Sequence, residues 1–152
     1  MQKLTLHLAI LFVALNVVFT ACKKDDTYVP RTNTELITYK PWRLQHLYFK
    51  QAIDSNWRLE DTTLLPCEID NITTYKTNNT FTYDEGVVKC DTSKLAPQIL
   101  VSGTWSLQNN QSSLIVGTSS GLTQNYTIEA LTQNLLQVSY KDSGYYREVY
   151  VH

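Results

Sequence analysis

Charged side chains are scarce in this chain of 152 residues. They make up 18% of it, and the net charge is only -1, whereas an average soluble domain carries roughly 25% charged residues. A protein that neutralises nucleic-acid phosphates or an anionic membrane surface needs a surplus of Lys and Arg. The composition therefore argues against a dedicated nucleic-acid binder and against a polybasic membrane-binding patch.

Recognisable catalytic motifs are missing as well. The sequence has no nucleophile elbow, no Gly-rich phosphate loop and no histidine–carboxylate metal motif. After the first 21 residues it retains only His46 and His152. A single His on a strand is more often a hydrogen-bonded core residue than an acid–base group. We expect no enzymatic activity, no metal and no cofactor.

A long amphipathic helix is also lacking. Short runs rich in Trp, Tyr, Val, Ile and Thr are present instead, and clusters of Asn, Gly, Asp and Ser separate them. This pattern is typical of antiparallel β structure. The runs span residues 42–51, 57–61, 72–77, 80–84, 87–90, 103–107, 113–117, 125–131, 135–140 and 145–151.

The segments between these runs have the residues of tight turns. Asn78-Asn79, residues 84–86 (Asp-Glu-Gly), 109–111 (Asn-Asn-Gln) and 142–144 (Asp-Ser-Gly) each suit a hairpin, because Asn and Gly tolerate positive φ. Residues 93–101 are less regular and predict a longer loop. Hairpins make neighbours in sequence neighbours in the sheet, so we expect an all-β, antiparallel, up-and-down β-barrel of about eight strands. An open sandwich is the alternative.

The first 21 residues have the parts of a secretory signal: Lys3, an almost wholly apolar run over 4–19, and small residues before Cys22. Phe19-Thr20-Ala21-Cys22 resembles the lipobox of bacterial lipoproteins, in which the cysteine is acylated, with palmitate among the acyl chains, and becomes the new amino terminus. The alternative, an uncleaved spanning helix, is disfavoured because the run is short for a hydrocarbon core about 30 Å thick. We therefore expect a lipid anchor on Cys22.

The residues after Cys22 look like a charged tether. Lys23-Lys24-Asp25-Asp26 resembles the signal that directs lipoproteins of one group of Gram-negative bacteria to the outer face of the outer membrane. The alternative is a solvated linker of mixed charge. We predict a signal peptide over 1–21, a lipidated flexible tether over 22–38 and a single domain over 39–152, anchored to the outer membrane and displayed on the cell surface.

Several short motifs of the predicted domain occur in an order that resembles the lipocalin-like domain of bacterial lipoproteins. They are residues 40–44 (Lys-Pro-Trp-Arg-Leu), 65–71, Cys90-Asp91, 103–107 (Gly-Thr-Trp-Ser-Leu) and 128–132. The resemblance covers residue 39 to the end. It implies an eight-stranded barrel with room for an internal cavity and no established enzymatic role. It also implies that Trp42 points into the base of the barrel, and alternation then sends Leu44, His46 and Tyr48 inward.

Lipocalins often cover the base Trp with an Arg from the last strand. Arg147 is the candidate here, and a guanidinium stacked on the Trp42 indole would contribute ~1–2 kcal/mol if desolvated. The alternative is a surface Arg147 that pairs with Glu148 or Asp142 and contributes little.

Two cysteines remain once Cys22 is assigned to lipid. Cys67 and Cys90 are an even pair in an exported protein, so we predict a disulfide bond; a zinc site would need more Cys or His ligands nearby. The bond would bring Glu68, Asp70 and Asp91 together. Three carboxylates could hold calcium, although a solvated acidic rim is the favoured interpretation.

Two hypotheses of function follow. The first is a monomeric ligand-binding barrel, anchored to the membrane, whose aromatic cavity accepts a small apolar or amphipathic molecule. The second is an interaction module with a filled barrel, whose loops bind a protein or a glycan. For the first hypothesis the predicted cavity residues are Trp42, Tyr48, Trp105, Tyr126, Tyr140 and Tyr145.

Overall fold

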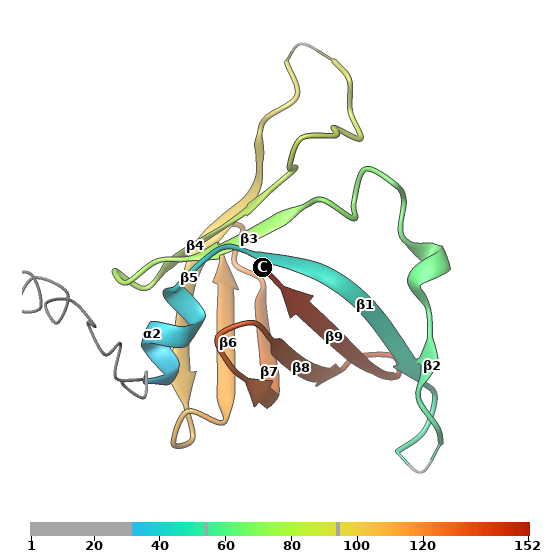
Figure 1. Ribbon diagram of the computed structural model, residues 1–152, viewed down its shortest axis with the longest axis vertical. Helices are drawn as coiled ribbons and strands as arrows, with labels where there is room; N and C mark the ends of the chain where they lie inside the picture. The colour runs from blue at the N-terminus through green and yellow to red at the C-terminus, as the bar shows by residue number, and fades with distance from the viewer. Residues whose placement is uncertain (1–31, 54, 94) are drawn as a thin grey trace, which may run out of the picture. The chain divides into compact units, whose positions relative to one another are not determined.

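The computed structural model describes residues 32–53, 55–93 and 95–152. This part of the chain forms one antiparallel sheet of nine strands in the order β2-β1-β3-β4-β5-β6-β7-β8-β9, and an additional pairing of β1 with β9 closes the sheet on itself (Figure 1). The strands are β1 (Trp42–Lys50), β2 (Arg58–Leu59), β3 (Ile72–Tyr75), β4 (Thr80–Asp84), β5 (Ile99–Gln108), β6 (Ser113–Thr118), β7 (Thr123–Leu131), β8 (Leu136–Lys141) and β9 (Tyr145–Val151).

Closure makes an eight-stranded, up-and-down barrel of β1 and β3–β9. From β3 to β9 each strand pairs with the next along the chain. β1 pairs with β9 over residues 43–50 but with β3 only at Trp42 and Arg43. The two-residue strand β2 pairs with the far part of β1, at Tyr48 and Phe49. The predicted all-β barrel is confirmed, and the sandwich alternative is excluded.

Asparagine shapes two of the predicted hairpins. Asn79 has φ 64° between β3 and β4, and residues 109–111 all have positive φ between β5 and β6. Asn accepts this left-handed conformation more readily than most residues. The turn at residues 142–144 joins β8 to β9 as predicted, with the Asp142 N–H donating to the Gly144 carbonyl at 2.9 Å. The local signals were therefore sufficient to place these hairpins.

A short helix closes one end of the barrel. Helix α2 (Asn33–Thr38) begins at a capping box in which the Thr32 and Glu35 side chains each accept a hydrogen bond from the other residue's backbone N–H. Its Ile37 is fully buried, and the Trp42 Nε1–H donates to the Ile37 carbonyl at 2.8 Å. Residues 33–38, which the sequence analysis placed in the tether, thus form a helix with a residue buried in the core of the domain.

Trp42 anchors this closed end of the barrel. Its side chain is fully buried, as the resemblance implied, and its ring lies 3.9 Å from the His152 ring, centroid to centroid. The His152 Nδ1 also lies 2.8 Å from the Pro41 carbonyl oxygen.

None of the helices in the described part of the chain is long and apolar enough to cross a membrane.

A β-bulge in β1 reverses the faces that alternation predicts. The register shifts between Leu44 and His46, so the side chains beyond the bulge exchange faces. Leu47 and Phe49 face inward, opposite Glu148 and Tyr146 of β9. The prediction that His46 and Tyr48 point into the barrel is therefore wrong.

The opposite end is open and carries the longest loops, with the segment between β4 and β5 extending furthest (Figure 1). The strand predicted at residues 87–90 is wrong: Val87 and Val88 are 88% and 53% exposed and pair with no strand. β5 instead begins at Ile99, within the predicted loop.

The predicted disulfide is confirmed, since Cys67 and Cys90 are bonded with their Cα atoms 5.1 Å apart.

Candidate functional site

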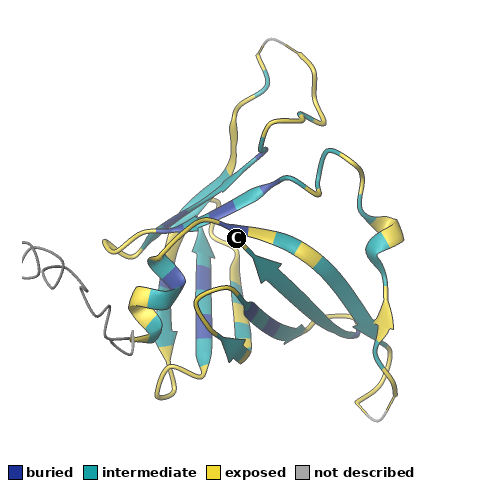
Figure 2. Ribbon diagram, viewed as in Figure 1, coloured by how far each residue is buried: buried dark blue, intermediate teal, exposed yellow. Residues whose placement is uncertain are grey.

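A cavity of about 530 Å³ occupies the barrel interior and opens at the end opposite helix α2. Side chains from every strand between β3 and β9 reach it. Figure 2 shows how buried segments of the strands give way to exposed loops at this open end. The lining residues are Thr73, Tyr75, Phe81, Tyr83, Val101, Val116, Thr118, Leu122, Thr123, Gln124, Tyr126, Tyr140, Asp142 and Tyr150.

Packed aromatic rings form the floor of the cavity. The Tyr75 ring meets the Trp105 ring edge to face at 5.6 Å and lies 6.2 Å from the Phe81 ring. The Trp105 Nε1–H donates to the Lys76 carbonyl at 3.0 Å, which satisfies its polar atom. Trp105 itself is 4% exposed and supports the floor from within the core.

Gly103 of β5 allows strand β6 to approach closely beside the cavity. It pairs with Phe81 on one side and Thr118 on the other. A Cβ at this position would stand 2.0 Å from the Gly117 carbonyl oxygen. Only glycine permits such a close approach of two strands.

Glu148 is an acidic residue on the inner face of β9. It lies between Leu47 of β1 and Val138 of β8, and Val138 is 2% exposed. The Tyr150 hydroxyl donates to Glu148 Oε2 at 2.7 Å, and the Tyr140 side chain is hydrogen-bonded to the same carboxyl. Burial raises the pKa of Glu148, although these two hydrogen bonds counteract part of the rise. The group is a carboxyl held among tyrosines, and no Lys or Arg of the described residues forms an ion pair with it.

The surrounding tyrosines are all held neutral. Burial, and the nearby Glu148 carboxylate, raise the pKa of the hydroxyls of Tyr75, Tyr126, Tyr140 and Tyr150 well above the ordinary value. The Tyr126 ring meets the Tyr140 ring edge to face at 5.3 Å, and Tyr140 stacks on Tyr146 at 5.1 Å. The site therefore combines ring faces, neutral hydroxyls and one carboxyl.

Only two of the six predicted cavity residues, Tyr126 and Tyr140, line the cavity. Trp42 lies at the closed end and Trp105 beneath the floor. Tyr48 and Tyr145 are on the outer face, because the bulge reverses β1 and because the inner face of β9 carries Tyr146, Glu148 and Tyr150. The Lys50 Nζ lies 5.3 Å from the Tyr145 ring centroid on that outer face.

The predicted stack of Arg147 on Trp42 is wrong. Arg147 pairs in register with Tyr48, six residues along β1 from Trp42, and it too is on the outer face. Its guanidinium lies 4.2 Å from the Trp57 ring centroid, and its Nε is 2.6 Å from Glu129 Oε2. The ring that packs against Trp42 belongs to His152, tilted by 34°.

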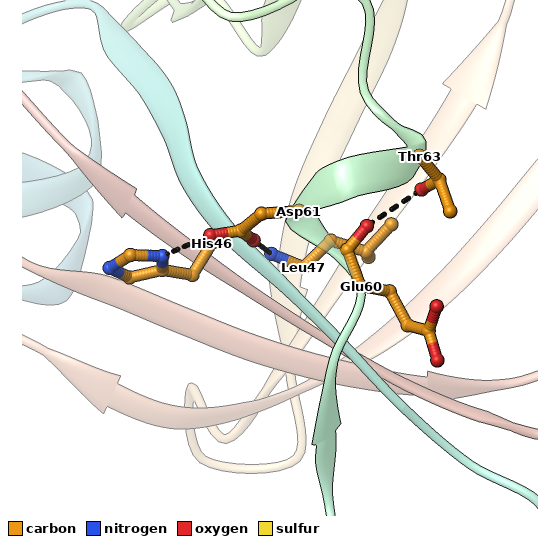
Figure 3. A network of polar contacts seen from close by, with 5 residues as sticks. All are labelled: His46, Leu47, Glu60, Asp61 and Thr63. Atoms are coloured by element: carbon orange, nitrogen blue, oxygen red, sulfur yellow. Dashed lines mark hydrogen bonds and ion pairs between the residues drawn. The ribbon is translucent and has the colours of Figure 1, made fainter.

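A second polar network connects β1 to the 3-10 helix η1 (Asp61–Thr63) outside the barrel (Figure 3). His46 Nδ1 lies 2.6 Å from Asp61 Oδ2, and the Leu47 N–H donates to Asp61 Oδ1 at 2.8 Å. Burial alone would raise the pKa of Asp61, but these two contacts lower it. The network holds η1 against the strand and does not reach the cavity.

The hypothetical calcium site near the disulfide is not formed. Each carboxylate accepts backbone hydrogen bonds: Asp70 from Val87 and Val88, Glu68 from Leu65, and Asp91 from Ser93. In residues 32–53, 55–93 and 95–152 no group of three or more His, Cys, Asp and Glu side chains is placed to bind a metal ion. These carboxylates shape the loops instead.

Glu148 and Tyr150 were missed by the sequence analysis. The sequence does contain a signal for a shared face, because Tyr146, Glu148 and Tyr150 occupy alternate positions of the last strand. The other face, with Tyr145, Arg147, Val149 and Val151, alternates equally well, so periodicity alone does not choose between them.

The predicted lipid-attachment residue Cys22 and the signal before it lie outside the described residues. The chain matches no known family model, and no curated protein sequence matches it.

Proposed function

We propose that this protein is a membrane-anchored, lipocalin-like lipoprotein that binds a small apolar or amphipathic molecule inside its barrel, without catalysis. The observation that supports binding is the open cavity of about 530 Å³. This volume falls within the roughly 300–1,000 Å³ of small-molecule sites, and the mixture of aromatic walls with a few convergent polar groups is typical of them.

The sequence supports the anchor. The apolar segment that ends at Thr20-Ala21-Cys22 and the charged residues 23–26 suit a lipidated protein displayed on an outer membrane. A tethered barrel would hold its ligand close to the cell instead of carrying it away.

Native mass spectrometry of the protein, purified gently from its own host, tests the proposal. We expect a reproducible extra mass that disappears on denaturation. The matched variants are Gln124→Trp and Asn125→Trp. Gln124 lines the cavity, whereas its neighbour Asn125 is exposed and does not line it.

The proposal requires that Gln124→Trp lowers the occupancy at least about tenfold while Asn125→Trp leaves it unchanged. A bare mass in every preparation, together with failure to bind any of a panel of small amphiphiles, would overturn it.

A second candidate function is supported by the loops at the open end. They expose aliphatic side chains that have no role in the core: Leu65, Ile69, Val87, Val88, Leu95 and Leu122. Exposed apolar clusters often mark interaction sites, so a module that binds a protein through these loops is the alternative. Substitution of Val87 and Leu95 by Ser would abolish such binding and leave the cavity intact.

A further inference from the structure

The tyrosine hydroxyls beside Glu148 have their hydrogens already committed. A phenolic hydroxyl has one hydrogen to donate and can also accept. Tyr150 donates its hydrogen to Glu148 Oε2 at 2.7 Å, and Tyr140 is bonded to the same carboxyl. Both tyrosines line the cavity. What they offer to a ligand is therefore the acceptor side of their oxygens, and the ligand group that meets them must be a hydrogen-bond donor.

The charge inside the cavity is of one sign. Its lining includes Asp142 near the mouth and includes no Lys, Arg or His. The cations on β1, β8 and β9 belong to the outer face: Lys50 and Lys141 lie over the Tyr145 ring, and Arg147 pairs with Glu129. Within the described residues Glu148 has no ion-pair partner. A buried carboxylate without a counter-charge is costly, and a cationic ligand would supply the missing charge.

The rings add a third feature. Tyr75, Tyr126 and Tyr140 line the same cavity, with Tyr126 and Tyr140 in edge-to-face contact at 5.3 Å. The negative faces of aromatic rings attract cations, and clusters of such rings recognise organic ammonium groups. The apolar floor formed by Tyr75 and Phe81 can bury the remainder of such a molecule.

We propose that the cavity selects an amphipathic organic amine, whose ammonium group donates hydrogen bonds to the Tyr140 and Tyr150 hydroxyl oxygens beside Glu148. The inference rests on the proposed ligand-binding function and adds the charge class of the ligand. It also gives Glu148 a role: the carboxylate orients the two hydroxyls as acceptors and balances the charge of the amine.

Three probes of equal chain length test the inference: octylamine, octanol and octanoate, titrated into the full-length protein at neutral pH by calorimetry. A hydrogen bond to a charged group that replaces a neutral one is expected to strengthen binding at least about tenfold. We therefore expect octylamine to bind at least about tenfold more tightly than octanol, and octanoate to bind most weakly.

Two variants isolate the groups responsible. Glu148→Gln keeps the shape and removes the charge, so octylamine should bind no better than octanol. Tyr150→Phe keeps the ring and removes one acceptor, and should lower the preference for the amine several-fold. Glu129→Gln is the control, because it removes a carboxylate from the outer face, where Glu129 pairs with Arg147. It should leave all three affinities unchanged.

The pH dependence gives an independent readout. Glu148 is faced by titratable hydroxyls from five strands, β3, β4, β7, β8 and β9, and all of them stay neutral near pH 7: Tyr75, Tyr83, Tyr126, Tyr140 and Tyr150. Leu47 faces it from β1. Amine affinity should therefore rise with pH as Glu148 ionises, and this rise should be absent from Glu148→Gln.

The outcomes separate the two proposals. If octanol or octanoate binds as tightly as octylamine, the charge preference is wrong and the ligand-binding function stands. If Gln124→Trp changes nothing and no probe binds, the binding function itself fails. If Glu129→Gln weakens the amine as much as Glu148→Gln does, the effect is one of overall charge and the assignment to Glu148 is overturned.

Discussion

The contribution of the Cys67–Cys90 bond can be measured with the double variant Cys67→Ser, Cys90→Ser. The two cysteines are 23 residues apart in sequence. In the chain-entropy model a closed loop of this length restricts the unfolded chain enough to contribute roughly 3 kcal/mol to the free energy of unfolding. For a domain of this size, that loss corresponds to a fall in Tm of about 12 °C.

The folded state has other means of holding the same loops. Asp70 Oδ2 accepts hydrogen bonds from the Val87 and Val88 N–H groups at 2.7 and 2.8 Å, and Glu85 Oε1 accepts one from the Cys90 N–H at 2.8 Å. We therefore expect the double variant to keep its native structure and its ligand affinity. The loss of stability should arise from the unfolded state.

Urea unfolding followed by tryptophan fluorescence gives the free energy of unfolding, and calorimetric titration gives the affinity. Single Cys→Ser variants are poor controls because they leave a free thiol, so the comparison is with the wild-type protein. A loss of less than about 1 kcal/mol, or a loss of ligand affinity together with stability, would refute the entropic explanation.

Four further substitutions test other parts of the structure by the same unfolding assay. Trp42→Ala removes the fully buried ring at the closed end and should cost about 3–5 kcal/mol. Gly144→Ala places a Cβ 2.3 Å from the Phe49 ring and should cost about 1–3 kcal/mol by overpacking. Thr32→Ala removes the helix cap and should cost about 1 kcal/mol. Glu148→Gln should instead stabilise the protein at neutral pH, because burial raises the pKa of Glu148 in the folded state.

The sign of the last effect follows from proton linkage. Because the folded-state pKa of Glu148 lies above its unfolded value, the folded protein binds more protons than the unfolded chain between those two pKa values. The stability of the wild-type protein should fall as pH rises through this interval and be lower above it. Glu148→Gln should lack this decline. A gain in stability that is equal at pH 4 and pH 8 would contradict this explanation. The capping role of Thr32 is tested separately by Thr32→Ser, which keeps the hydroxyl: a cost equal to that of Thr32→Ala would contradict that role.

The barrel could be predicted from the sequence because its signals are local. Alternating apolar residues mark the strands, and Asn79 and the Asn109-Asn110 pair mark turns that need positive φ. A meander of such hairpins has few ways to pair, and closure removes its two edges. Helix α2 is too short for a periodicity signal, although Thr32 and Glu35 form the spacing of a capping box.

The site could not be predicted, because it depends on which face of each strand is buried. The bulge between Leu44 and His46 has no marker such as glycine, yet it reverses every side chain after it. Each face of β9 carries one charged residue among tyrosines or valines, so the sequence does not decide whether Arg147 or Glu148 points inward. The pairing of Glu148 with the buried Val138 shows that Glu148 points inward, and such pairing exists only in the assembled sheet.

Both ends of the described chain are gathered at the closed end of the barrel. Helix α2 follows Thr32 and accepts a hydrogen bond from Trp42 through the Ile37 carbonyl, and His152 packs against the same Trp42 ring. The mouth of the cavity is at the other end. A support attached at Thr32 or at His152 would therefore meet the closed end, with the entrance to the cavity on the opposite side. Arrays coupled at residue 32 and at residue 152 should accordingly capture ligand to the same extent.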